Sequence, residues 1–304
     1  MRGLEFLGPV DYQALPQAEF TAALAAMGIP GEAARHIQGV YDWETKRLYS
    51  NADMSPVQAR GTRIHETFHA LQDQLFGLEA LMRRARTVDE QYAAKALVEG
   101  DATLTFIECM PESRARRMLE IRRPWEFSGT PPSYDDTPSG AAAQVEMVFD
   151  YAIAAKFIQA VKERQGWAGV NALYRQPPLS TAQILHPEKY FRHDAPVDVG
   201  LPDISGSLPP GWRLESMDTR GEFMTYLMFL KYPATGPEAE SLADGWTGDL
   251  VRRYSNGTNA FTVWKSRWET PKDAQEFLDG LRKINPSGNL SYDPRDNSVL
   301  ALME

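Results

Sequence analysis

The chain has few of the residues that build disulfide-bonded or nucleic-acid-binding proteins. It contains one cysteine, Cys109, so no disulfide can form within the chain. Its 32 basic residues are outnumbered by 41 acidic ones, and the net charge of −9 argues against a protein that binds nucleic acid through charge. No run of 18 apolar residues is present, and we therefore expect no membrane span.

The first residues also lack the pattern of a secretory leader. No apolar stretch follows residues 1–6, so we expect no signal peptide here. At 304 residues and 43% apolar content, the chain can bury a substantial core and, at about 150 residues per domain, form two domains. We expect the proline- and glycine-rich stretch 196–210 to link a domain over 1–195 to a smaller one over 211–304.

Histidine is scarce as well, with five in the chain, yet two stand in the pattern His-Glu-x-x-His. On a helix, His65 and His69 lie one turn apart on one face and can hold a single metal ion. Glu66 is rotated by about 100° from His65 and can reach a water molecule instead. Upstream, residues 55–58 (Ser-Pro-Val-Gln) supply the capping serine, the proline and the glutamine that start a helix. The pattern predicts a catalytic zinc site with one ion.

Catalytic zinc usually has three protein ligands, so one more has to be found. A third histidine of the metzincin type is excluded, because those positions hold Gln72 and Leu75. A capping box at Thr87 predicts a second long helix, which runs without proline to residue 110. Within it, Glu99 is a carboxylate in an otherwise apolar stretch, where burial is costly without a partner. We predict Glu99 as the third ligand and keep Asp101 as the alternative.

Metal-bound histidines usually donate their second ring nitrogen to a carboxylate or a carbonyl. Asp73, four residues after His69, and Asp101 and Thr103 on the second helix are the candidate partners. Each of the three is also compatible with an ordinary solvated helix residue.

Several segments together resemble a family of metallopeptidases. The order of a His-Glu-x-x-His helix and a glutamate on a second helix looks like the gluzincins, the thermolysin-like zinc metallopeptidases. A little-characterised bacterial family of predicted gluzincins is similar over most of residues 36 to 270, in the segments HETFHALQDQ at 65–74, GVYD at 39–42, VEGDA at 98–102 and ILHPEKY at 184–190. The resemblance implies zinc on His65, His69 and Glu99, with Glu66 as the catalytic carboxylate, and it favours a periplasmic or secreted location. The chain departs from the family at residues 181–183, where Thr-Ala-Gln replaces the expected Thr-Glu-Gln.

The predicted function is zinc-dependent hydrolysis of peptide bonds. Glu66 takes a proton from metal-bound water, which attacks the scissile carbonyl of an extended peptide. The oxyanion needs a further donor, for which His186 is the leading candidate and Tyr190 and Tyr151 are alternatives. Esterase or other amide hydrolysis is a lesser variant of this chemistry, and imidazole and carboxylate also accept divalent ions other than zinc.

The second class of function is a non-catalytic binding or assembly protein that keeps the metal for stability. A purely structural zinc site closes its fourth position with a protein ligand and has no use for a base beside it. The presence of Glu66 therefore favours the enzyme. The expected partner is a peptide or protein substrate, and the oligomeric state is open.

The predicted fold class is α+β, with a mostly helical zincin-like core, a small sheet edge and a smaller α+β C-terminal region. A hairpin over 39–50 precedes the motif helix, and by analogy its edge strand pairs with an extended substrate. The loop over 124–140 is a candidate cover for the cleft. Further elements are expected as helices near 17–37, 140–165, 222–230 and 271–284 and as hairpins over 252–267 and 289–302.

Overall fold

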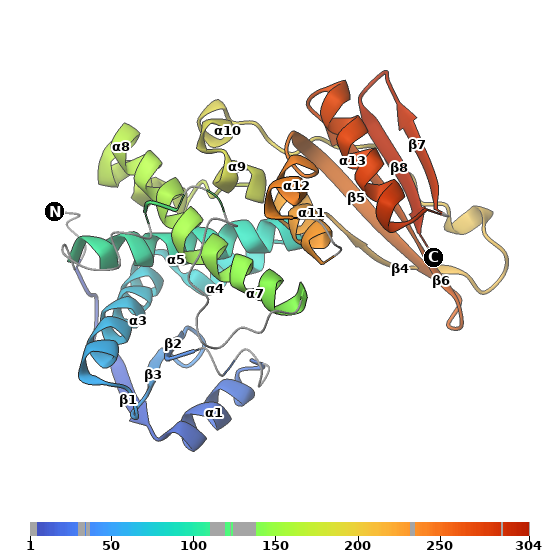
Figure 1. The fold of residues 1–304 in the computed structure, drawn as a ribbon. Coiled ribbons are helices and arrows are strands. Elements are labelled where there is room, and N and C mark those ends of the chain that lie inside the picture. The colour runs from blue at the N-terminus through green and yellow to red at the C-terminus, as the bar shows by residue number, and fades with distance from the viewer. Residues whose placement is uncertain are drawn as a thin grey trace. The chain divides into compact units, whose positions relative to one another are not determined.

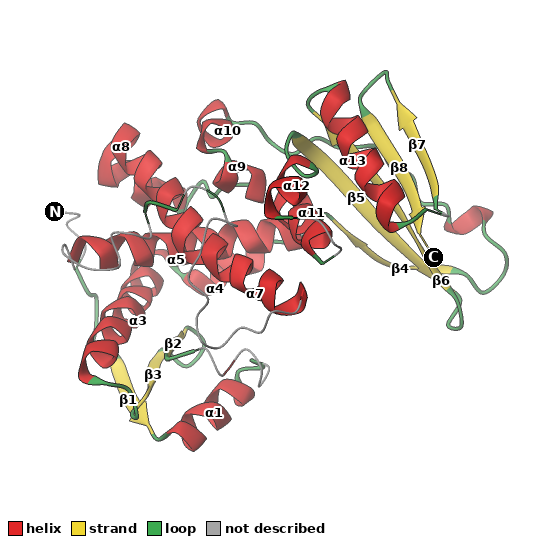
Figure 2. Cartoon of the chain, in the orientation of Figure 1, coloured by secondary structure: helices red, strands yellow, loops and turns green. Residues whose placement is uncertain are grey.

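The structure is a computed structural model that describes residues 5–29, 34, 37–109, 119–121, 123, 138–231, 235–286 and 288–303. Within them the chain is mixed α and β, as predicted, and its strands form two sheets (Figures 1 and 2). The chain divides into two compact units. Unit 1 holds Met1–Arg84, Ala94–Ser133 and Met147–Pro177, and unit 2 holds Ala85–Ala93, Tyr134–Glu146 and Pro178–Glu304. The zincin-like character of the core and the domain limits at 195 and 211 remain predictions.

The sheet of unit 1 has three strands in the order β1-β3-β2. β1 (Asp11–Leu15) runs parallel to β3 (Arg47–Asn51), and β2 (Gly39–Asp42) pairs antiparallel with β3. The hairpin expected over 39–50 is therefore confirmed, and β2 lies at the edge of the sheet. β1 had not been predicted, because a parallel strand that pairs across 36 positions leaves no local hairpin signal.

The helices of unit 1 carry its apolar core. They are α1 (Gln17–Ala26), α3 (Pro56–Phe76), α4 (Leu78–Arg84), most of α5 (Val88–Cys109), the π-helical turn η2 (Phe149–Ile153) and α8 (Ala154–Leu173). α1 is shorter than predicted: it ends at Ala26, and Gly28 follows with a left-handed φ of 79°. Residues 30–33 and 35–36 lie outside the described residues. The apolar stripe of α3 is buried through Phe68 and Leu71, which pack with Ala102 of α5.

Unit 2 is built on a five-stranded antiparallel sheet in the order β4-β5-β6-β8-β7. Its strands are β4 (Arg213–Asp218), β5 (Trp246–Ser255), β6 (Ala260–Trp268), β7 (Asn289–Asp293) and β8 (Ser298–Met303). α13 (Pro271–Ile284) covers the sheet, and its Phe277 packs against Trp264 and Trp268 (Figure 1). The two hairpins and this helix confirm the predicted elements, whereas β4 had not been predicted.

The remaining helices of unit 2 lie before and between these strands. They are α9 (Thr181–Leu185), α10 (Pro187–Arg192), the short 3-10 turn η3 (Ser205–Ser207), α11 (Gly221–Leu230) and α12 (Gly236–Ser241). α7 (Pro138–Val148) contributes to both units. The loop proposed as a cover for the cleft lies, over residues 124–137, outside the described residues.

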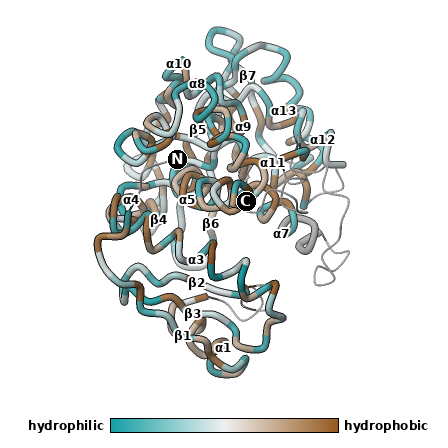
Figure 3. The backbone as a smooth tube through the Cα atoms, turned by 90° about the vertical axis from the view of Figure 1, so that its left-hand side faces the viewer, coloured by the Kyte–Doolittle hydropathy of each residue, from teal (hydrophilic) through white to brown (hydrophobic). Residues whose placement is uncertain are grey.

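Apolar and polar stretches alternate along the backbone of each unit (Figure 3). Among the described residues, none of the helices combines the length and the apolar character needed to cross a membrane.

Candidate metal centre

α3 places the His-Glu-x-x-His motif in its third and fourth turns. Ser55 caps the helix: its Oγ accepts the backbone N–H of Gln58 at 3.4 Å, while its own N–H donates to Gln58 Oε1 at 3.1 Å. Pro56 follows at the first helical position, and the helix ends at Gly77, whose φ of 70° lies in the left-handed region. These caps, which are the ones the sequence predicts, keep His65 and His69 in unbroken helix.

Three side-chain donors converge between α3 and α5. His65 Nε2 lies 3.0 Å from His69 Nε2 and 3.1 Å from Glu99 Oε2, and His69 Nε2 lies 3.4 Å from the same oxygen. Donors around one tetrahedral zinc ion, each at roughly 2.0–2.1 Å, stand about 3.3–3.4 Å apart. The three atoms therefore fit a single ion without rearrangement of the helices.

Burial at this site is deep but incomplete. The side chains of His65 and Glu99 are 16% and 18% exposed, and that of His69 is 9% exposed. A set that reaches solvent on one side suits a site with one open coordination position. Asp101, the alternative third ligand, is fully buried and accepts a hydrogen bond from Tyr174 instead.

His69 and Glu99 stabilise one another's charged forms. Burial acts to lower the pKa of His69, but the charge and the hydrogen bond of Glu99 outweigh it and raise this pKa to about 9. Burial likewise acts to raise the pKa of Glu99, yet the charge of His69 and the hydrogen bonds of both histidines bring it below its usual range. A divalent cation at the same place would take over the role of the proton on His69.

Glu66 is hydrogen-bonded to β2. Its Oε2 accepts the backbone N–H of Tyr41 at 3.0 Å, and the residue is 8% exposed. Burial raises the pKa of Glu66, although the charges of the two histidines oppose this. Gly39 on the same strand has no room for a side chain, since a Cβ there would lie 2.4 Å from Thr62 Cγ2 and 3.0 Å from Glu66 Cγ. The absence of that side chain lets β2 approach α3.

The expected partners of the histidine rings are wrong in part. Gln72, which is fully buried, contacts His69 through its Oε1 at 2.7 Å from Nδ1. Asp73 instead accepts from Tyr41 Oη at 2.9 Å and from Lys46 Nζ at 2.7 Å, and Asp101 Oδ2 lies 3.3 Å from Gln72 Nε2. The signal for Gln72 was its place three residues after His69 on a helix, where side chains are neighbours.

Tyr151 lies beside the metal site in unit 1. Its ring centroid is 5.8 Å from that of His65. The residue belongs to η2, and π-helical turns of this kind are frequent at functional sites. The periodicity of the sequence does not reveal such a turn, because it inserts one residue into an otherwise regular helix.

His186 belongs to unit 2, together with Tyr190. His186 Nε2 lies 2.6 Å from Glu222 Oε1 and 3.7 Å from Asp244 Oδ1. Burial acts to lower the pKa of His186, but the charge and the hydrogen bond of Glu222 outweigh it, so the pKa is raised. Glu222 is 4% exposed, and Lys189 Nζ lies 3.9 Å from its second oxygen. These contacts give His186 a structural partner within its own unit, and its catalytic role remains a prediction.

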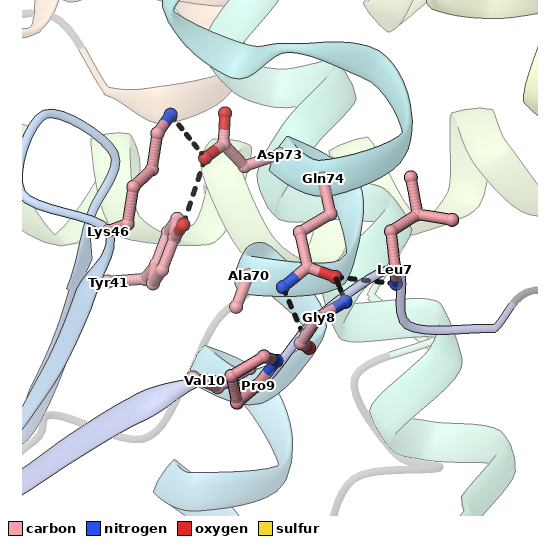
Figure 4. A pocket seen from close by; sticks show the side chains of 9 residues that line it. All are labelled: Leu7, Gly8, Pro9, Val10, Tyr41, Lys46, Ala70, Asp73 and Gln74. Carbon is pink, nitrogen blue, oxygen red and sulfur yellow. Dashed lines mark hydrogen bonds and ion pairs between the residues drawn. The ribbon is translucent and has the colours of Figure 1, made fainter.

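A pocket of about 410 Å³ opens beside α3, whose Ala70, Asp73 and Gln74 line it (Figure 4). Figure 4 shows Tyr41 and Lys46 both directed at Asp73, and the amide of Gln74 bonded to the backbone of the N-terminal segment. The three candidate ligands do not line this pocket. The convergence of donors, and not the pocket, therefore marks the chemical site.

Comparison with known proteins bears on the other unit of the chain. The family described as a domain of unknown function (DUF8575) matches residues 212–298, which include β4 to β7. No curated protein and no solved structure matches the chain. The match covers less than half of the chain and contains none of the residues His65, Glu66, His69 and Glu99.

Proposed function

We propose that the chain is a zinc-dependent peptidase of the gluzincin type. The observation that carries the proposal is the convergence of His65 Nε2, His69 Nε2 and Glu99 Oε2, each 3.0–3.4 Å from the others. Glu66, one position after the first ligand, is directed toward the neighbouring strand and is left available as a base. A structural zinc site would not need such a group.

Zinc held by His65, His69 and Glu99 would supply Lewis acidity, which makes water a nucleophile near pH 7 and polarises a carbonyl. Glu66 then takes up a proton and later returns it to the leaving amine. One of its oxygens is fixed by the N–H of Tyr41, so the carboxylate keeps one orientation while Oε1 carries the proton. The raised pKa of Glu66 favours the first half of this transfer, because a stronger base accepts the proton more readily.

The position of β2 supports an extended peptide as substrate. β2 is paired on one side with β3, and it lies at the sheet edge beside the helix that carries Glu66. A main chain that pairs with such an edge is held by backbone hydrogen bonds and needs no particular sequence. The scissile carbonyl of a peptide held there would come close to Glu66.

Tyr151 is a candidate donor for the oxyanion, alongside His186 and Tyr190. It neighbours His65 within the same unit, whereas His186 and Tyr190 belong to unit 2. Loss of one oxyanion donor typically costs about a hundredfold to a thousandfold in turnover. This magnitude separates the candidates in a comparison of single variants.

The test is a Glu66→Gln variant assayed with a peptide library by mass spectrometry, with metal content measured in parallel. We expect one zinc per chain in both proteins and a loss of cleavage of roughly a hundredfold to ten-thousandfold in the variant. Glu79→Gln, an exposed residue of α4, is the matched control and should cleave normally. A zinc-loaded Glu66→Gln protein that cleaves like the parent would refute the enzyme, and a zinc-loaded parent without cleavage would favour the metal-stabilised binding protein.

A further inference from the structure

Gln72 sits at the centre of a buried polar network in unit 1. Its Oε1 lies 2.7 Å from His69 Nδ1, and its Nε2 lies 2.9 Å from the carbonyl oxygen of Val98 and 2.6 Å from Tyr174 Oη. Gln72 and Asp101 are both fully buried. A buried amide of this kind is costly unless its donors and acceptors are all matched.

The partners of Gln72 determine which way its amide points. The Val98 carbonyl can only accept a hydrogen bond, so the group that faces it has to be the NH₂ of Gln72. The oxygen of Gln72 then faces His69, and Nδ1 of that ring has to be the donor. A neutral imidazole with its proton on Nδ1 keeps a lone pair on Nε2, the atom that lies beside His65 and Glu99.

The chain of hydrogen bonds runs from Gln72 through Tyr174 to the carboxylate of Asp101. Tyr174 Oη accepts from Gln72 and donates to Asp101 Oδ2 at 2.7 Å, and Gln72 Nε2 also lies 3.3 Å from that oxygen. The ring of Tyr174 is stacked on Phe76 with centroids 4.0 Å apart and an interplanar angle of 10°. This stacking restricts the position of the Tyr174 ring and therefore of its hydroxyl oxygen.

We propose that Gln72, oriented by Tyr174 and Asp101, is a positioning residue that holds His69 as its Nδ1–H form and thereby sets the affinity of the site for zinc. The inference rests on the metal site of the proposed function, but it does not depend on peptidase activity. Metal ligands are commonly oriented by such an outer contact, and its loss costs about tenfold to a hundredfold in affinity.

The same amide also connects the two helices that carry the donors. Val98 and Asp101 flank Glu99 on α5, while Gln72 and His69 belong to α3. The contacts from Gln72 to Val98 and Asp101 therefore fix the position of α5 along α3, so that Glu99 lies opposite the two histidines. Loss of Gln72 affects both the tautomer of His69 and the placement of the third donor, which is why its effect should exceed that of Tyr174.

The experiment compares zinc affinity, by competition with a chromophoric chelator at one pH, for the parent chain and for Gln72→Met and Tyr174→Phe. Methionine keeps the length of glutamine but can neither accept from His69 nor donate to Val98. We expect a tenfold to hundredfold weaker affinity for Gln72→Met and a loss of severalfold for Tyr174→Phe. The visible absorption of the cobalt-loaded Gln72→Met protein should also differ from that of the parent, because the ligand field changes with the orientation of His69.

Gln183→Met is the matched control. Gln183 is a buried glutamine of unit 2 whose amide donates to the Asp194 carbonyl and accepts from the Leu179 N–H. This variant should lose stability but keep its zinc affinity within about twofold. Parent-like affinity and an unchanged cobalt spectrum in Gln72→Met overturn the inference, and if Gln72→Met does not fold, parent-like affinity in Tyr174→Phe does so. A parent chain that binds no zinc overturns the proposed function itself, which is a separate outcome.

Discussion

Gly100, the residue after Glu99, offers a test of how closely the metal site depends on helix packing. A Cβ at this position would lie 2.5 Å from the carbonyl carbon of Ala154, 2.6 Å from its oxygen and 2.8 Å from its Cβ. All three are parts of the rigid first turn of α8, and no flexible side chain can move aside. Carbon atoms in contact prefer about 3.5–4.0 Å, so Gly100→Ala has to separate α5 from α8 by roughly 1 Å.

Two opposing effects determine how much Gly100→Ala changes the free energy of unfolding. Alanine is favoured over glycine inside a helix by about 0.5–1 kcal/mol. An extra methyl group in a packed core costs typically 1–3 kcal/mol, and here the neighbour is backbone, which places the cost at the upper end. We expect a net loss of about 1–2 kcal/mol in the free energy of unfolding of the metal-free protein. A shift of α5 would also displace Glu99, and metal sites tolerate only about 0.2 Å in their distances, so zinc affinity should fall by about tenfold or more.

Gly61→Ala is the matched control, because Gly61 also lies inside a helix, α3. A Cβ there would meet Phe106 Cε2 at 3.5 Å, which is ordinary contact. The free energy of unfolding of this variant should be about 0.5–1 kcal/mol higher than that of the parent, and its zinc affinity should be unchanged. Urea unfolding in the presence of a chelator measures the first quantity, and zinc competition measures the second. If Gly100→Ala is as stable as Gly61→Ala and binds zinc as tightly, the close approach of α5 and α8 is refuted.

Three further outcomes follow from the structure. Tyr151→Phe should lower turnover about a hundredfold or more at unchanged zinc content. The same assay on His186→Ala decides between the two candidate oxyanion donors. The residue whose variant keeps normal turnover is removed from the mechanism. Burial raises the pKa of Asp89 to about 8, so the stability that this residue contributes is fully present below about pH 4 and is lost as the pH rises toward 8. Asp89→Asn should therefore be more stable than the parent at pH 8, on the order of a few kcal/mol, and similar to it at pH 4; an equal difference at both pH values in urea unfolding contradicts the shift. If free zinc is a hundred times the dissociation constant, zinc adds about 2.7 kcal/mol to the free energy of unfolding. Removal of zinc by a chelator should therefore lower the melting temperature of the parent. A His65→Ala/His69→Ala double variant should show no such change.

The parts of the site that can be predicted from the sequence depend on residues close together in the chain. The capping box of Ser55 and Gln58 is complete within four residues, and His65 and His69 are one helical turn apart. Glu99 was found differently, as a carboxylate in an apolar helix that would be costly to bury alone. The structure brings it to both histidines, and its role as a ligand stays a prediction.

The parts of the fold and of the site that cannot be predicted from the sequence depend on partners far apart in the chain. β1 pairs with β3 across 36 positions, and β4 pairs with β5 without a hairpin turn between them. Tyr151 comes near His65 because η2 changes the phase of its helix, and a π-helical turn leaves no mark in an apolar pattern. Local propensity and periodicity describe single elements, so they cannot give these relations.

Gln72 shows the difference most clearly. In the sequence it only excludes a metzincin, because the residue at that position is not glycine. In the structure the same side chain contacts His69 on its own helix and the backbone of the helix that carries Glu99. The first contact spans three residues and was open to a helical argument, whereas the second spans 26 and depends on the register of α5 against α3. A network that sets both the proton position on His69 and the position of Glu99 therefore couples metal affinity to helix packing. Substitution of Gln72 should weaken zinc binding through His69 and Glu99, and substitution of Gly100 through Glu99.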